Sequence, residues 1–303
     1  MKLNPIAVIL FTCMVLLLTI TSCEIINPEE DIPSYIQIDT VIVNSNDIRT
    51  GTSSHRVTDV WVSVGNNFIG AFPLPARIPV LEEGNQPLIV DAGIIVDGRT
   101  EKRLIYPFYT RLLSDVDLTR AAITNVIPAV EYLPDDEMDV LMLEDFDFGG
   151  GTILGEDLDG NPATVLTVTT GTANVFEGQA SAMVELNTLD SLAIVGSNIP
   201  YITFDAEGTK PTFLEMHYKS DSQIQIGVFG YDQDFVRQQA GFFLAFRPRE
   251  NWTKVYVDLK PSIDDLRGNL GYTYFQLVLR VDKSNDDPKS FTFFDNLKIF
   301  RLK

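Results

Sequence analysis

The sequence comprises 303 residues, of which 45% are hydrophobic and 21% charged, and its mean hydropathy is +0.07. This composition is that of a globular protein long enough for one large domain or two medium ones. The 42 acidic residues outnumber the 23 basic ones and give a formal net charge of −19. An acidic surface repels phosphate groups, which argues against binding to nucleic acid or electrostatic binding to a membrane; the charge equally serves plain solubility.

The N-terminal segment predicts a secretion signal. Lys2 precedes an apolar run of 15 residues, Ile6 to Ile20. A membrane-spanning helix needs about 20 such residues, whereas the apolar region of a signal peptide is of this length. No A-x-A-like cleavage site follows. Instead, Ile20-Thr21-Ser22-Cys23 resembles the lipobox of bacterial lipoproteins, although Ile and Thr stand where Ala and Leu are commonest.

This resemblance implies a lipid anchor. Residues 1–22 would be the signal peptide, and Cys23 would be acylated on its thiol and its amino group with fatty acids such as palmitate. Each buried acyl CH₂ contributes about 0.8 kcal/mol, so several chains would hold the protein firmly in the bacterial outer membrane. Residues 23–33 form an acidic tether, similar to the export signal of surface-exposed Bacteroidetes lipoproteins; a plain solvated linker is the alternative.

Two short motifs resemble the Asp-Ser/Thr-apolar sequon for O-glycosylation in the same phylum. They are Asp39-Thr40-Val41 and Asp190-Ser191-Leu192, with Thr40 and Ser191 as the acceptors. Ordinary strand residues are the alternative interpretation.

The remaining chain predicts an all-β protein, with no helical stripe over twelve or more residues. From about Ile32 onward, short runs of Val, Ile, Thr, Phe and Tyr alternate with Gly, Asn, Asp and Pro, which is typical of strands and turns. Within 57–98, the run Val60 to Val64 alternates, and Gly65-Asn66-Asn67 predicts a hairpin turn into residues 68–72. The pattern resembles PEGA-type and related Ig-like sandwiches, which act as spacers or adaptors, and predicts a first domain over 34–133.

A second domain is predicted over 140–303, after an acidic linker at 134–139. It opens on "VLMLEDFDFGGGT", contains "ENWTKVYVDL" and closes on "KSFTFFDNLKIF". This order resembles jelly-roll modules of the carbohydrate-binding and galactose-binding-like kind. The sequence therefore predicts two β-sandwiches, an Ig-like one followed by a jelly roll.

A calcium site follows from this resemblance. Many such jelly rolls hold a structural Ca²⁺ between the opening and closing strands, and Glu144, Asp145 and Asp295 match that arrangement. Strict alternation in the last strand places Asp295 on one face with Phe291, Phe293, Leu297 and Ile299, where a carboxylate is costly unless it is paired or binds a metal. An Asp bonded to a basic side chain or to backbone is the alternative.

The segment 157–168 fails as an EF-hand loop. Pro162 replaces the required Gly and Val168 the required Glu, so a β-turn before a strand at 164–169 is predicted. Histidine-rich zinc sites are also excluded, because His55 and His217 lie far apart. Both cysteines, Cys13 and Cys23, lie at the N-terminus, so each domain must be stable through its own core.

Ligand binding is predicted for aromatic residues of the second domain. Sugar recognition requires an exposed aromatic plane with polar groups around it, for which the candidates are Phe229, Tyr231 and Trp252 with Arg247 nearby. Tyr272 and Tyr274 form a second pair, and the alternative for all of them is a place in the core.

Catalytic motifs find little support. There is no GxSxG, and the glycine run at 149–151 lacks the lysine of a phosphate-binding loop. Acidic pairs that a glycosidase requires occur in turn-like stretches, at 135–136, 264–265 and 286–287. The sequence thus predicts a non-catalytic, surface-exposed outer-membrane lipoprotein that binds glycan or another envelope component through its C-terminal jelly roll. Its alternatives are a structural subunit of an outer-membrane protein complex and a carboxylate-dependent glycoside hydrolase.

Overall fold

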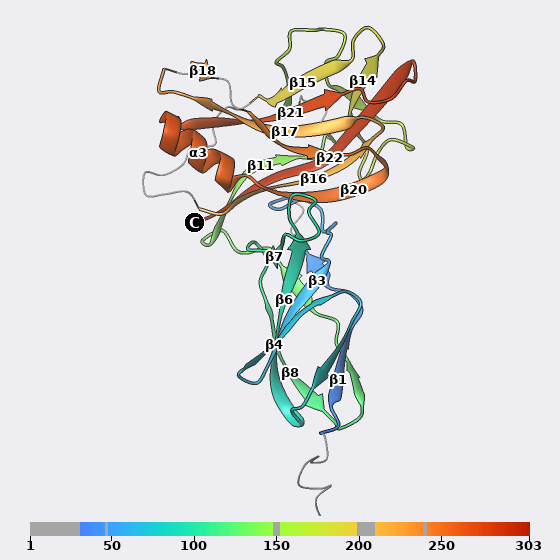
Figure 1. The fold of residues 1–303 in the computed structure, drawn as a ribbon, viewed down its shortest axis with the longest axis vertical. Coiled ribbons are helices and arrows are strands. Elements are labelled where there is room, and N and C mark those ends of the chain that lie inside the picture. The colour runs from blue at the N-terminus through green and yellow to red at the C-terminus, as the bar shows by residue number, and fades with distance from the viewer. Residues whose placement is uncertain (1–30, 46–47, 148–151, 199–209, 235, 239–240) are drawn as a thin grey trace, which may run out of the picture.

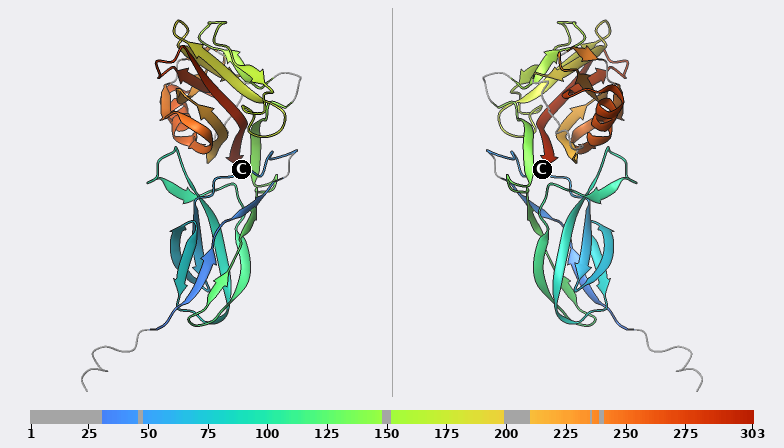
Figure 2. Two further views of the ribbon diagram at one scale, coloured as in Figure 1. Left: turned by 90° about the vertical axis from the view of Figure 1, so that its right-hand side faces the viewer. Right: turned by 90° about the vertical axis from the view of Figure 1, so that its left-hand side faces the viewer.

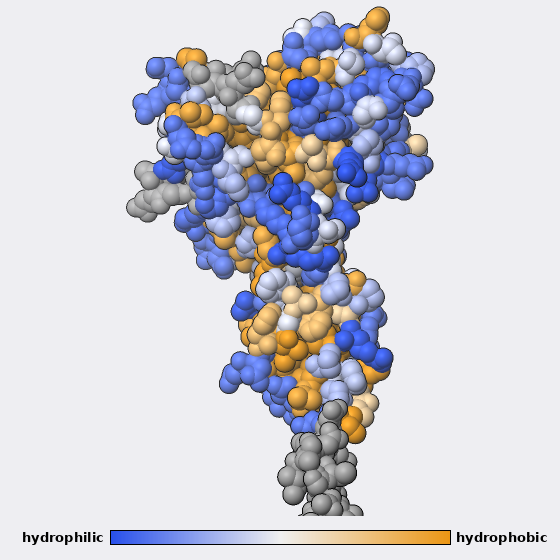
Figure 3. Space-filling model, in the orientation of Figure 1, coloured by the Kyte–Doolittle hydropathy of each residue, from blue (hydrophilic) through white to orange (hydrophobic). Residues whose placement is uncertain are grey.

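The computed structural model describes residues 31–45, 48–147, 152–198, 210–234, 236–238 and 241–303. The chain forms two β-sandwiches, one above the other, joined at a narrow waist (Figures 1 and 3). Almost all elements are strands, as the sequence predicts, and one helix lies in the described part of the chain. The predicted signal peptide, Cys23 and most of the tether lie outside these residues. No helix in the described ranges is long and apolar enough to cross a membrane.

The first sandwich packs two layers of strands around a core of Val, Ile and Leu side chains. One layer has the order β4-β3-β6-β7, with β8 also paired to β6; the other consists of β5-β1-β9 and the pair β10-β2. The predicted hairpin is confirmed: β3 and β4 are joined at Gly65, whose φ of 60° a side chain would strain. The strands are β1 Ser34–Ile38, β2 Ile42–Asn44, β3 Asp59–Val64, β4 Asn67–Pro73, β5 Ala76–Val80, β6 Gly84–Ile95, β7 Arg103–Ile105, β8 Leu112–Leu118, β9 Ile123–Asn125 and β10 Ala129–Glu131.

The second sandwich consists of two six-stranded sheets. The junction sheet, whose outer face meets the first sandwich, has the order β13-β14-β22-β16-β20, with β11 also on β22. The distal sheet has the order β12-β15-β21-β17-β18, with β19 also on β17. Their strands are β11 Met138–Glu144, β12 Leu154–Asp157, β13 Thr167–Thr169, β14 Ser181–Asn187, β15 Leu192–Ser197, β16 Thr212–Ser220, β17 Gln223–Tyr231, β18 Arg237–Gln238, β19 Phe242–Phe246, β20 Arg249–Asp258, β21 Tyr274–Asp282 and β22 Lys289–Leu302.

One short helix lies among the strands of this all-β fold. Helix α3, Lys260–Leu270, follows β20 and packs on the second core through Ile263 and Leu266. Its signals are present in the sequence: Pro261 in the first turn and Gly271 after the end, where φ is 73°. Its 11 residues, of which only Ile263 and Leu266 are buried, are too few for a helical stripe of twelve or more residues. The acidic pair at 264–265 therefore lies on this helix and not in a turn.

The predicted turn is confirmed at 158–163, after β12, although the following strand begins at Thr167 and not at Thr164. Asp157 accepts a hydrogen bond from the Gly160 amide (2.9 Å), and Asp159 accepts one from the Ile194 amide (2.7 Å). These carboxylates thus fix the turn. The predicted linker also ends earlier than expected, because β11 begins at Met138 and pairs with the end of β22.

The two sandwiches contact each other through backbone as well as side chains. Val96, after β6, forms a parallel bridge with Tyr256 of β20, and the Asp97 amide donates to the Tyr256 carbonyl at 2.8 Å. Tyr106 and Phe108 of the first sandwich pack against Phe213, Tyr256 and Phe300 of the second. The turn between β6 and β7 reaches β20 in Figure 1, and Figure 2 shows the same junction from both sides. Apolar packing of this kind fixes the relative position of the two sandwiches.

Candidate functional site

The site lies on the outer face of the junction sheet, and a β-bulge in β22 determines which residues reach it. Asn296 has φ 48°, and the pairing with β16 shifts there: Lys298 lies opposite Glu215, but Asp295 lies opposite His217. One residue is therefore inserted, and the alternation reverses beyond it. The strict alternation predicted for β22 is wrong after Asp295.

The consequence is that two charged residues share the outer face with aromatic ones. Phe293, Asp295 and Lys298 face outward, while Leu297 and Ile299 belong to the core between the sheets. Asn tolerates the left-handed conformation better than most residues, which is why the bulge can form at this position.

A buried ion cluster occupies the part of this face that the first sandwich covers. Glu215 is fully buried and lies 2.5 Å from the Lys254 amino group. Tyr106 donates to its carboxylate at 2.6 Å and Tyr132 at 3.1 Å. Lys298, also fully buried, donates to the Thr52 carbonyl at 2.7 Å. Burial raises the pKa of Glu215, but Lys254 and Lys298 outweigh it, and the pKa lies below its usual range.

His217 is held neutral beside this cluster. Its Nε2 lies 2.9 Å from the Ser54 hydroxyl, and its ring stacks on Phe176 with 4.0 Å between centroids. Burial, reinforced by Lys254 and Lys298, lowers the pKa of His217 to about 2. A ring that stays unprotonated near neutral pH cannot act as an imidazolium acid, and this buried ring serves as a stacking partner for Phe176.

Aromatic rings continue from His217 across the open part of the face. We call this set the aromatic row; its members, in order, are His217, Phe176, Trp252, Phe293 and Phe291. The ring centroids of consecutive members lie 4.0, 5.6, 6.4 and 6.4 Å apart. Phe176, Trp252 and Phe291 are partly exposed, whereas the other two are buried beneath them. The last two rings are nearly parallel, at 13°.

A hollow of about 540 Å³ lies at the Phe291 end of the row. We call it the sheet hollow; it is lined among others by Asn174, Lys219, Arg249, Glu250, Phe291 and Phe293. The Lys219 amino group lies 5.5 Å from the Phe293 ring centroid and donates to the Ala173 carbonyl. Partly exposed rings next to amide, carboxylate and cationic groups form a surface on which a sugar ring can stack and hydrogen-bond.

The predicted ligand residues are only partly brought together. Phe229 and Tyr231 lie on β17 of the distal sheet, are 8% exposed and belong to the core. Their assignment to a binding surface is therefore wrong, because in this strand the two rings fill the sandwich interior. Trp252 is partly exposed on the junction sheet, and its role in ligand binding stays a prediction. Arg247 lies in a separate pocket between the sandwiches. Tyr272 and Tyr274 pack partly buried against the core.

The structure does not assemble Glu144, Asp145 and Asp295 into a calcium site. Glu144 lies opposite Leu297, a core residue, and so faces the interior side of the sheet, whereas Asp295 faces the outer side. Glu144 accepts from the Phe146 amide and the Thr152 hydroxyl, both at 2.8 Å, and Asp145 from the Asp147 amide. No group of three acidic, histidine or cysteine side chains suited to a metal occurs among the described residues. The alternative, an aspartate bonded to backbone, describes Asp295.

Asp295 instead fixes the loop that carries Phe176. Its carboxylate accepts from the Ser181 hydroxyl at 2.5 Å and from the amides of Phe176, Glu177 and Asn296. Burial raises the pKa of Asp295 to about 6, although these hydrogen bonds lower it. The carboxylate thus positions a member of the aromatic row.

The raised pKa of Asp295 predicts a pH-dependent stability. Its folded-state pKa lies above the value of about 3.9 for an unfolded chain, so its contribution is complete below pH 4 and is lost as the pH rises through 6. Between pH 4 and 7, we expect the wild type to lose about 2 kcal/mol of unfolding free energy relative to Asp295→Asn. Urea titrations followed by Trp252 fluorescence would measure this difference, and parallel pH profiles of the two proteins would contradict the assignment.

The remaining predicted sites are accessible or solvated. Thr40 and Ser191 are both exposed, between β1 and β2 and between β14 and β15, so the two sequons can be reached; O-glycosylation stays a prediction. The acidic pairs at 135–136 and 286–287 lie in exposed turns.

Comparisons with known proteins add a fold-level context. No family model matches the chain, and no curated protein is similar to it. One similar solved structure is the CBM22-1 xylan-binding domain from Paenibacillus barcinonensis Xyn10C, with 13% identity over 56% of this chain and 97% of that chain and a TM-score of 0.37. A structure of carbohydrate-binding modules from the β-sandwich superfamily has 10% identity over 79% of this chain and 83% of that chain, with a TM-score of 0.35. The enzymatically active domain of bacteriophage CBA120 tailspike protein 4 has 12% identity over 52% of this chain and 20% of that chain, with a TM-score of 0.36.

Proposed function

We propose that the protein is a non-catalytic glycan-binding lipoprotein of the bacterial outer membrane, which binds carbohydrate on the junction sheet of its second sandwich. The observation that carries this proposal is the aromatic row together with the sheet hollow. Trp252 and Phe291 offer ring faces, and Asn174, Arg249 and Glu250 offer donors and acceptors around them. Stacking on the apolar face of a sugar with polar groups at its rim is how aromatic side chains recognise such ligands.

In the proposed arrangement, the first sandwich separates the lipid anchor from the second sandwich, which carries the binding surface. The lipobox resemblance implies lipid on Cys23, eight residues before the first described one. Strand β1 begins at the end of the first sandwich that is remote from the second (Figure 1). A lipid at Cys23 would hold this end near the membrane, and the first sandwich would act as a spacer that presents the second one to the surroundings.

Glycan binding is tested with two substitutions in the row. Trp252→Ala and Phe291→Ala are each expected to weaken glycan binding about tenfold, which corresponds to about 1.4 kcal/mol. A glycan array would identify ligands, and isothermal titration would measure the affinities. Phe68→Ala is the matched control, because Phe68 is 60% exposed but lies on the first sandwich.

Two outcomes would contradict the proposal. Absence of binding to every glycan on the array would favour a structural subunit, which should then co-purify in stoichiometric amount with a membrane partner. Release of new reducing ends from a bound glycan would show a glycoside hydrolase instead.

A further inference from the structure

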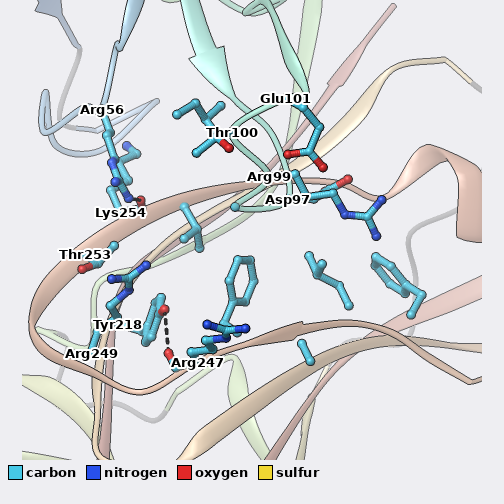
Figure 4. Close-up of a pocket in the computed structure, with 17 residues that line it drawn as sticks. Arg56, Asp97, Arg99, Thr100, Glu101, Tyr218, Arg247, Arg249, Thr253 and Lys254 are labelled. Atoms are coloured by element: carbon cyan, nitrogen blue, oxygen red, sulfur yellow. Dashed lines mark hydrogen bonds between the residues drawn. The ribbon is translucent and has the colours of Figure 1, made fainter.

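A pocket of about 560 Å³ between the two sandwiches concentrates positive charge in a protein whose net charge is −19. We call it the junction pocket. Four arginines line it: Arg56, Arg99, Arg247 and Arg249. Only 23 of the 303 residues are basic, so such a concentration around one cavity is unusual for this chain. In Figure 4, Arg56, Arg247 and Arg249 lie toward one end of the pocket and Arg99 toward the other.

Both sandwiches contribute to this pocket, and the fold positions the contributions. Arg56 precedes β3 and is held by two bonds to β20: its amide donates to the Tyr256 hydroxyl (2.9 Å) and its guanidinium to the Lys254 carbonyl (3.1 Å). Arg99 lies in the turn between β6 and β7. Arg247 follows the end of β19, and Arg249 is the first residue of β20, with Pro248 between them. The Tyr218 hydroxyl donates to the Arg247 carbonyl (3.1 Å).

The acidic residues of the pocket do not neutralise these arginines. Asp97 is paired with Lys102 at 2.6 Å and also accepts from the Asp258 amide. Lys254, the fifth basic residue of the lining, is paired with Glu215. Glu101 is the other acidic residue of the lining. Within the described part of the chain, no ion pair joins any of the four arginines to a carboxylate. All four are exposed and thus open to a ligand.

Arg249 lines both the junction pocket and the sheet hollow. A ligand in the sheet hollow therefore meets one of the four arginines of the junction pocket. Guanidinium groups bind planar oxyanions through paired N–H donors, and such charge-assisted hydrogen bonds are about twice as strong as neutral ones.

We propose that the junction pocket binds the anionic groups of an acidic glycan whose neighbouring sugar rings stack on the aromatic row. This inference rests on the proposed glycan-binding function and names the ligand class: a polysaccharide with carboxylate or sulfate groups. A uronate and a sulfated sugar share the oxyanion that the guanidinium groups recognise, and the experiment separates them.

The test measures binding of the full chain to three probes: a polyuronate, a sulfated polysaccharide and a neutral xylan. The double variant Arg56→Gln/Arg99→Gln removes two cations that do not line the sheet hollow, and it is expected to weaken binding of one anionic probe at least about tenfold. Its effect on a neutral glycan should be less than about twofold. Affinity for the anionic probe should also fall as NaCl rises from 50 to about 500 mM, since salt screens charge. Arg120→Gln is the matched control, because Arg120 is exposed on the first sandwich, away from the pocket.

The outcomes distinguish this inference from the proposed function. If Phe291→Ala weakens binding of the anionic probes but the arginine variant does not, the junction pocket is not a binding site and glycan binding by the aromatic row stands. If the protein binds neutral glycans alone, the inference is likewise overturned. Absence of binding to all three probes and to the array would overturn both.

Discussion

Substituting Glu215 by glutamine is expected to lower the free energy of unfolding by about 3–5 kcal/mol. The change is nearly isosteric, but it removes the negative charge that lies between Lys254 and Lys298 in the buried ion cluster. Glu215 also raises the pKa of Lys254 against the effect of burial, which lowers it. Without it, both buried amino groups lose this negative charge, and each must either stay charged at a higher cost or lose its proton. Both alternatives destabilise the folded state, whereas water solvates the same amino groups in the unfolded chain.

Urea unfolding measures this loss conveniently because the two sandwiches hold one tryptophan each, Trp61 and Trp252. The matched control is Glu185→Gln on β14, which breaks an exposed pair with Lys289 on the same sheet. An exposed pair contributes about 0–1 kcal/mol, so the control should unfold almost as the wild type does. Equal losses in both variants would show that the buried cluster has no special role.

Phe300→Ala is expected to cost about 3–5 kcal/mol and to loosen the contact between the sandwiches. Phe300 is fully buried and packs against Phe108 at 5.8 Å and Tyr132 at 5.1 Å between centroids, both from the first sandwich. Its removal leaves a cavity in the junction, because Phe108 and Tyr132 are themselves buried and packed against other rings. Faster proteolysis at the junction should accompany the loss.

Phe291→Ala provides the comparison within the same strand. Phe291 is partly exposed at the far end of β22, so its removal should cost little stability while it weakens glycan binding. Urea titration and limited proteolysis of both variants separate the two roles. A small stability loss in Phe300→Ala, with unchanged proteolysis, would contradict the view that aromatic packing couples the sandwiches.

Much of the fold follows from local sequence because strands and turns carry local signals. The alternation of Val60, Val62 and Val64 and the following Gly65 predict the β3–β4 hairpin directly. The all-β class follows from repeating the same argument along the chain. Helix α3 was predictable in part from Pro261 and Gly271, but its two core residues are too few to form a long stripe.

The candidate site was less predictable because its residues come together only through long-range contacts. Phe176 lies in a loop with no periodic signal, and hydrogen bonds to Asp295, far away in sequence, place it. The four arginines of the junction pocket come from three separate segments and two sandwiches. Phe229 and Tyr231 show the opposite error, since an aromatic residue in a strand has the same local pattern whether it faces solvent or core.

Because β22 contains the bulge at Asn296, the number of residues in this strand determines which side chains face the core. Residues Lys289–Phe294 pair with β14, and Leu297–Leu302 pair with β11, so the bulge lies where β22 changes partners on one edge. Deletion of Asn296 itself would restore the regular alternation, whereas deletion of a residue elsewhere in β22, with the bulge kept, would exchange the faces of all side chains on one side of the deletion. Lys298 would then point into the apolar interior, and Ile299 would point into the buried ion cluster. Insertions in the turn at 158–163 would add only loop entropy, about 0.6 kcal/mol per doubling of length. Natural variation in chain length should therefore be found in that turn and be absent from β22.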